Sequence, residues 1–241
     1  GNHRCEPTQR DTLFPLALSG GRFMTRIILV RHGQTAWNRE ERFRGREDLP
    51  LDETGRRQAK AVGQRIAAEW SPSAIYCSPL RRAVETAQAI GDACGLPVQP
   101  WPGLIDIDYG EWQGLTPAEA AARYPALHRA WLEAPHTVQI PGGESLGTVR
   151  ARAFAALQEI IARHPDETIV IVGHTVVNRL LLCAILGLDN SRFWRLHQET
   201  AAINLFQWDG ADFTLISLND TCHLRRTHPG GQGEEGGATG A

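Results

Sequence analysis

The sequence predicts an α/β fold in which helices cover both faces of a mainly parallel sheet. Three short apolar runs, at 26–30, 74–77 and 168–172, have the composition of buried strands. Longer segments with apolar residues at helical spacing separate these runs. Strands that alternate with helices along a chain are typical of parallel sheets covered on both faces.

Local signals set the expected ends of the other elements. We expect helices at 54–70, 78–94, 117–133, 145–164 and 176–186, and two further strands at 202–208 and 213–218 joined by a turn. Ser78 is the expected N-cap of the second helix, which Gly95 ends, and Pro125 should interrupt or bend the third. Ser145 is the expected N-cap of the fourth.

Composition bounds the class of protein. The 241 residues are 42% hydrophobic and 22% charged, which suits one large domain or two small ones. The 25 Lys and Arg and 27 Asp and Glu give a net charge of −2, which argues against nucleic acid held by bulk positive charge. No apolar run approaches the roughly 20 residues that span a membrane. Neither nucleic acid nor a membrane is therefore an expected partner.

The cysteines and the two ends of the chain carry further expectations. The five cysteines are widely spaced and form no CxxC pair, which predicts reduced thiols and a cytoplasmic location. We expect residues 1–23 to be a flexible N-terminal extension and the Gly-rich residues 227–241 to be a disordered tail. One domain should occupy 24–226.

Polar side chains follow three of the predicted strands. Arg31 and His32 come after the first strand, Arg81 and Arg82 after the second, and His174 after the third. Ligands of open α/β sheets bind outside the carboxyl ends of the strands, so these side chains should converge if the strands are neighbours. Arginines recognise oxyanions, and a neutral imidazole is a nucleophile that can hold a phosphoryl group. The pattern favours phosphoryl chemistry.

Such a site also needs a proton donor for the leaving oxygen. The segment 104–112 supplies three carboxylates between the second and third long strands: Asp106, Asp108 and Glu111.

Six sequence motifs occur in one order along the chain: RHGQTAWN (31–38), LDETGRRQA (51–59), SPLRRAVETA (78–87), LIDIDYGEWQG (104–114), PGGES (141–145) and VGH (172–174). In these motifs the chain resembles the histidine phosphatase superfamily, the phosphoglycerate-mutase-like proteins. The resemblance implies a three-layer sandwich with a small helical capping region at about 115–140. It also implies catalysis without a metal or other cofactor.

Matched by position, the resemblance implies a role for each motif residue. His32 would be the nucleophile that becomes phosphohistidine, and Arg31, Arg82 and His174 would form the phosphate pocket. Asp106 would be the proton donor, although the family commonly has Glu there, and Asp108 and Glu111 are the alternatives. The substrate would also meet the following residues: Gln34, Thr35, Asn38, Gly45 and Thr175.

The family contains hydrolases and mutases. Mutases carry a Lys after the QG motif and two arginines after a Trp, whereas this chain has Pro117 and the pair Leu132 and Glu133. The chain is also short between Trp131 and Pro141, where the mutases have a longer insertion. We therefore expect a metal-independent phosphomonoester hydrolase acting on a small phosphorylated metabolite, with a cofactor-dependent phosphoglycerate mutase as the alternative.

Two remote alternatives and two further questions stay open. Residues 143–147 match the G-x-S-x-G elbow of serine hydrolases with Ser145 as nucleophile, but no buried strand leads into it. A non-catalytic phosphate-binding protein is the other alternative. Aromatic residues of the capping region either contact the substrate or pack the region's own core. The apolar segments 176–186 and 189–196 either contribute to a homodimer or cover the sheet.

Overall fold

The computed structural model describes residues 24–227. Within this range one sheet has the strand order β3-β2-β4-β1-β5-β6. The strands β3, β2, β4 and β1 run parallel, and β5 pairs antiparallel with both β1 and β6. The strands are β1 (Thr25–Arg31), β2 (Ala74–Cys77), β3 (Val98–Pro100), β4 (Thr168–Gly173), β5 (Ile203–Trp208) and β6 (Phe213–Asp220). The α/β class with a mainly parallel sheet is confirmed.

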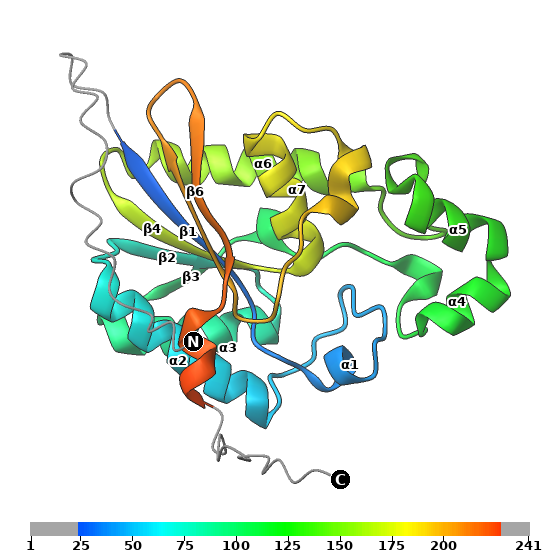
Figure 1. Cartoon of the computed structure of the whole chain (residues 1–241), viewed down its shortest axis with the longest axis horizontal. Helices are drawn as coiled ribbons and strands as arrows, with labels where there is room; N and C mark the ends of the chain where they lie inside the picture. The colour runs from blue at the N-terminus through cyan, green and yellow to red at the C-terminus, as the bar shows by residue number, and fades with distance from the viewer. Residues whose placement is uncertain (1–23, 228–241) are drawn as a thin grey trace, which may run out of the picture.

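Helices fill the connections. The α-helices are α1 (Ala36–Arg39), α2 (Glu53–Glu69), α3 (Arg81–Cys94), α4 (Pro117–Arg123), α5 (Pro125–Glu133), α6 (Leu146–Ala162) and α7 (Thr175–Ile185). Short 3₁₀ turns are η1 (Pro102–Leu104), η2 (Gly110–Trp112), η3 (Pro135–Thr137), η4 (Asn190–Arg195) and η5 (Cys222–Thr227). The helices α4 and α5 stand apart from the layers that flank the sheet, where the capping region was expected (Figure 1).

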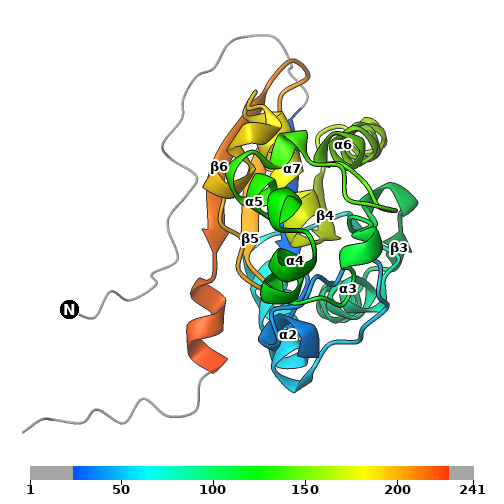
Figure 2. The ribbon, with the colours of Figure 1, turned by 90° about the vertical axis from the view of Figure 1, so that its right-hand side faces the viewer.

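Alternation along the central strands produces two cores. Ile27 and Leu29 of β1 pack with α6 and α7, whereas Ile28 and Val30 pack with α2 and α3. Successive strand residues point to opposite faces, so an uninterrupted apolar strand requires cover on both sides. Figure 2 shows α6 and α7 on one side of the sheet and α2 and α3 on the other. The three-layer arrangement follows from this pattern.

Most expected boundaries agree with the structure within a few residues, and the break at Pro125 separates α4 from α5. The N-cap prediction for Ser78 is wrong, because α3 begins at Arg81 with Leu80 as its extended N-cap. Ser78 Oγ instead accepts a hydrogen bond from the Leu80 amide at 3.3 Å, in a turn ahead of the helix. Strand β3 was not anticipated, since three residues are too few to show a period.

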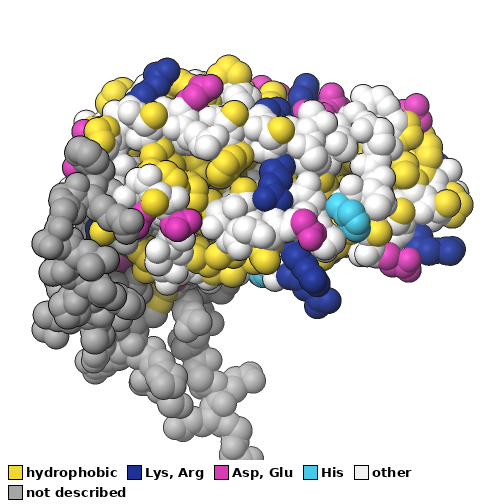
Figure 3. Space-filling model, turned by 90° about the horizontal axis from the view of Figure 1, so that it is seen from above, with side chains coloured by type: hydrophobic (Ala, Val, Ile, Leu, Met, Phe, Trp, Pro, Cys, Tyr) yellow, Lys and Arg dark blue, Asp and Glu magenta, His cyan; other side chains and the backbone are white. Residues whose placement is uncertain are grey.

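The expected extension at 1–23 lies outside the described residues, as does the tail from 228 onward; Thr227, the first residue of the expected tail, ends η5. No helix in the range 24–227 combines the length and apolarity needed to cross a bilayer. Figure 3 shows one face of the molecule, where positive and negative side chains are interspersed.

The cysteines differ from expectation at one position. Cys77, Cys94 and Cys183 are free thiols, whereas Cys222 is disulfide-bonded. The prediction of exclusively reduced thiols is therefore wrong for Cys222. Spacing along a chain does not reveal which residues the fold brings within disulfide distance.

Candidate active site

Two neighbouring parallel strands deliver the two histidines to one point. The register of β1 and β4 pairs Arg31 with Gly173, and each histidine is the first residue after its strand. The His32 amide donates to the Gly173 carbonyl at 3.0 Å. His32 and His174 are both fully buried, and their ring centroids lie 5.2 Å apart.

The hydrogen bonding of His32 fixes its tautomer. Its Nδ1 lies 2.6 Å from the Gly33 carbonyl oxygen, which can only accept, so Nδ1 carries the proton of the neutral ring. Nε2 is then an unprotonated nitrogen, and this buried atom has no partner among the described residues. Burial, together with the charges of Arg82 and Arg31, holds the pKa of His32 well below its ordinary value. His32 therefore presents a free lone pair at neutral pH.

Arg82 is a fully buried cation held by backbone carbonyls. It donates from Nη1 to Glu47 and from Nη2 to Gly45, both at 2.7 Å, and from Nη2 to Asp106 Oδ2 at 3.1 Å. Its burial lowers the pKa, which the Asp106 carboxylate partly offsets. Arg81, the residue before Arg82, is exposed and pairs with Glu85 at 3.4 Å.

Asp106 lies beside Arg82 and His174. Its Oδ1 accepts from the Ile107 amide at 2.9 Å, and its Oδ2 lies 3.6 Å from His174 Nδ1. The side chain is buried, with a relative exposure of 6%. His174 has neither ring nitrogen hydrogen-bonded within the described residues, and burial and nearby cations lower its pKa well below the ordinary value.

The two alternative acids are engaged elsewhere. Asp108 accepts from the Gly110 amide at 2.9 Å and lies 3.6 Å from Arg46, and Glu111 accepts from the Tyr124 hydroxyl. Of the three carboxylates, only Asp106 lines the cavity described next. The geometry therefore favours Asp106 as the proton donor.

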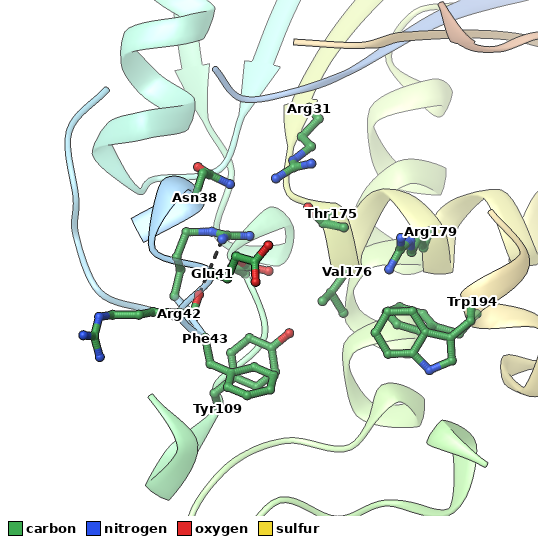
Figure 4. Close-up of a pocket in the computed structure, with 13 residues that line it drawn as sticks. Arg31, Asn38, Glu41, Arg42, Phe43, Tyr109, Thr175, Val176, Arg179 and Trp194 are labelled. Atoms are coloured by element: carbon green, nitrogen blue, oxygen red, sulfur yellow. Dashed lines mark hydrogen bonds between the residues drawn. The ribbon is translucent and has the colours of Figure 1, made fainter. Parts of the chain in front are cut away.

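Asp106 lines a cavity of about 280 Å³, whereas His32, Arg82 and His174 are not among its lining residues. Figure 4 shows Arg31, Thr175 and Arg179 on one side and Asn38, Glu41 and Tyr109 on the other. Its lining residues are Arg31, Asn38, Glu41, Arg42, Phe43, Arg44, Asp106, Tyr109, Thr175, Val176, Arg179, Phe193 and Trp194.

Arg31 is anchored by its Nη1, which donates to the Gln198 carbonyl at 2.5 Å. Burial, with the charges of Arg44 and Arg179, lowers the pKa of Arg31 to about 9. An anion in the cavity would relieve this crowding of positive charge.

The substrate-binding predictions divide into two groups. Asn38 and Thr175 line the cavity, and Asn38 Oδ1 accepts from the Thr35 amide at 2.9 Å and from the Thr35 hydroxyl at 2.8 Å. Gln34 does not line the cavity, because its side-chain Nε2 donates to Asp52 Oδ2 at 3.0 Å, at the start of α2. Thr35 is fully buried and caps α1, and it also lies outside the cavity.

Gly45 contributes through its backbone. Its φ of +50° disfavours any side chain, and an added Cβ would lie 3.2 Å from the Ile107 carbonyl oxygen; the Gly45 carbonyl accepts from Arg82. Gly45 therefore shapes the pocket without lining it.

Sequence reasoning missed three cations of the cavity: Arg42, Arg44 and Arg179. Arg179 lies one helical turn after Thr175 on α7, so the spacing could have placed both on one face. Its Nε donates to the Leu196 carbonyl at 2.6 Å, and its guanidinium lies over the rings of Phe193 and Trp194. Arg44 stands among several loop arginines, and no sequence signal separates it from them.

The aromatic residues of the capping region mainly pack its own core. Trp112 is fully buried and Trp131 is 3% exposed, and the centroids of their rings lie 6.2 Å apart. The segments considered for a dimer interface also pack inside the chain, as the full burial of Leu180 and Phe193 shows. Trp194, at 40% exposed, is an exception and borders the cavity.

Ser145 is the N-cap of α6, as predicted. Its Oγ accepts from the Thr148 amide at 3.2 Å and contacts the Thr148 hydroxyl at 3.1 Å, and within residues 24–227 no histidine is hydrogen-bonded to it. In the range 24–227, no group of three or more His, Cys, Asp or Glu side chains is arranged to hold a metal ion.

The chain matches one known protein family over most of its length. The model of the histidine phosphatase superfamily (branch 1) matches residues 27–221. The chain belongs to the histidine phosphatase superfamily. Its similarity to named phosphatases of this superfamily supports a hydrolase that acts on phosphate monoesters.

Individual members of the superfamily match over most of their length. The chain is 39% identical over 201 residues to phosphoserine phosphatase 1 of Hydrogenobacter thermophilus, covering 83% of this chain and 95% of that protein. It is 32% identical to a metal-independent phosphoserine phosphatase of Arabidopsis thaliana, covering 83% and 84%. The solved structure of Bacillus stearothermophilus YhfR superimposes with a TM-score of 0.79 at 33% identity, covering 83% and 99%.

Proposed function

We propose that this histidine phosphatase hydrolyses a phosphomonoester of a small metabolite through a phosphohistidine on His32, without a metal ion. One observation carries the proposal: His32 Nε2 is buried, unprotonated and, among the described residues, unpartnered, and His32 follows directly on Arg31, which lines the cavity together with Asp106. A group arranged in this way is a nucleophile for an anionic phosphate.

In the first step His32 Nε2 attacks phosphorus, and the bond from phosphorus to the ester oxygen breaks. Arg31, Arg82 and His174 bind the non-bridging oxygens, where negative charge must be stabilised. Asp106 donates its proton to the departing oxygen, which leaves as an alcohol.

In the second step water attacks the phosphohistidine. Asp106, now a carboxylate, takes a proton from this water as the bond from phosphorus to Nε2 breaks. The products are inorganic phosphate and neutral His32, with Asp106 protonated again for the next cycle.

The hydrolase is favoured over the mutase by the residues of the capping region. Pro117 begins α4 and Glu133 ends α5, so neither position supplies the cation that a mutase would use for a triply charged substrate. A cytoplasmic location and a homodimer stay predictions from the sequence.

The experiment is a phosphatase screen in EDTA with para-nitrophenyl phosphate and a panel of alkyl phosphates. We expect turnover by the unaltered protein, a trapped phosphohistidine on acid-free quenching, and loss of both in His32→Ala. A label that survives in His32→Ala would exclude the mechanism. Phosphate binding without turnover would point to the non-catalytic alternative, and transfer between phosphoglycerate positions to the mutase.

A further inference from the structure

The backbone on both sides of Arg44 is held firmly in the cavity wall. The Phe43 amide donates to the Leu115 carbonyl at 2.9 Å, and the Phe43 ring packs against Tyr109 with the ring centroids 5.0 Å apart. On the other side the Gly45 carbonyl accepts from Arg82 at 2.7 Å. Arg44 therefore extends from a fixed stretch of chain into the cavity that Arg31, Asp106 and Thr175 also line.

Arg44 has unused hydrogen-bonding capacity. Among the described residues no carboxylate lies within ion-pair distance of it, and its Nη1 makes only a 3.5 Å contact with the Arg42 carbonyl. Its Nε is buried and without a partner. Its neighbours differ, since Arg42 pairs with Glu40 at 2.7 Å and Arg46 with Glu144 at 3.4 Å. Uncompensated guanidinium groups are costly to shield from water, so these donors favour an anionic ligand.

The charge of Arg44 acts on the groups at the base of the cavity. It lowers the pKa of both His32 and His174, and it lowers the pKa of Arg31 and Arg82 as well. Arg44 is therefore near enough for its charge to act on these groups, and it lines the same cavity as Arg31 and Asp106. Asp106 offsets the charge of Arg82 by direct contact, and Arg44 has no such partner in the described chain.

We propose that Arg44 is a catalytic residue, a third guanidinium that binds the non-bridging oxygens of the phosphoryl group beside Arg31 and Arg82. This inference rests on the proposed function and adds to it a residue that none of the sequence motifs singled out. Arg44 exchanges no proton; its fork of N–H donors binds the phosphate in the ground state and the charge that spreads over its oxygens during transfer.

The test measures the affinity for inorganic phosphate by calorimetry and kcat and KM with para-nitrophenyl phosphate. The variants are Arg44→Gln, Arg44→Lys and the control Arg39→Gln, whose side chain is 66% exposed and near Asp52. Melting curves of each variant report on folding. If Arg44→Gln does not fold, Arg44→Lys carries the test, because it keeps the length and the charge.

We expect Arg44→Gln to raise the Kd for phosphate and lower kcat/KM by about 10- to 100-fold, the range for losing a hydrogen bond to a charged group. Arg44→Lys should fall between this variant and the unaltered protein, and Arg39→Gln should stay within twofold. Phosphate affinity within twofold in both Arg44 variants would overturn the inference. Absence of turnover by the unaltered protein would overturn the proposed function instead, while phosphate affinity would still decide the role of Arg44.

Discussion

Asp106 reaches the histidine pair with a side chain one methylene shorter than glutamate. Its Oδ2 lies 3.1 Å from Arg82 Nη2 and 3.6 Å from His174 Nδ1, while Oδ1 is fixed by the Ile107 amide. The backbone of the loop must therefore approach the site closely, because the side chain supplies little of the reach. This arrangement leads to a prediction about leaving groups.

Asp106→Asn should slow hydrolysis of alkyl phosphates far more than that of aryl phosphates. A poor leaving oxygen needs a proton in the transition state, and general acid catalysis contributes about 10²- to 10⁴-fold. The measurement is kcat/KM for a series of phosphate esters of increasing leaving-group pKa, whose slope should steepen in the variant. Equal losses across the series would assign Asp106 a binding role alone.

A single arginine of α6 supports the loop that carries Asp106. Arg152 donates to the carbonyl oxygens of Ile105 at 2.6 Å and Asp106 at 3.0 Å, and its Nε binds Glu144 Oε1 at 2.9 Å. Glu144 Oε2 in turn accepts from the Asp108 amide at 3.0 Å. The position of the acid thus depends on a helix from another part of the chain.

Arg152→Ala should reproduce the leaving-group sensitivity of Asp106→Asn in weaker form, with kcat for alkyl phosphates reduced about tenfold, as expected for lost hydrogen bonds to a charged group. KM should change little, because Arg152 lies outside the cavity lining. Arg150→Ala is the matched control, since Arg150 of the same helix binds the Leu188 carbonyl instead. A loss of kcat that is uniform across esters would indicate that the substitution disturbs the site as a whole and not the position of Asp106 alone.

The elements differ in how far the sequence reveals them. Short apolar runs predicted β1, β2 and β4, and three histidine and arginine motifs at their ends predicted the base of the site. Arg44 could not be found in this way, because its importance comes from Phe43 and Gly45, whose contacts are made with distant parts of the chain. The position of the Gln34 side chain outside the cavity likewise depends on its hydrogen bond to Asp52 at the start of α2.

At the scale of the whole molecule, three buried histidines link folding to pH. The pKa values of His32 and His174 lie well below the ordinary value, and that of His223 is lowered to about 4, in each case mainly through burial. Below about pH 6.5 the unfolded chain binds protons at these positions while the folded chain does not. The free energy of unfolding must therefore fall as the pH falls.

We expect each of the three histidines to contribute about 1.4 kcal/mol per pH unit to this decline at pH values well below 6.5. Urea unfolding between pH 7.5 and 5 measures it, in a range where ordinary carboxylates remain ionised. In His223→Asn the slope should decrease by about one third, because one of three groups is removed. A slope that His223→Asn leaves unaltered would contradict the assignment to buried histidines.

The pairing of β1 with β4 makes chain length, as well as residue identity, a requirement of the site. His32 and His174 meet because each stands one position beyond a matched pair, Arg31 and Gly173. A single deletion at the end of β1 would bring Gly33 to the place of His32, and one at the end of β4 would bring Thr175 to the place of His174. Insertions and deletions can therefore be accommodated in the distant loops, whereas the number of residues at these two strand ends must stay unchanged in both strands.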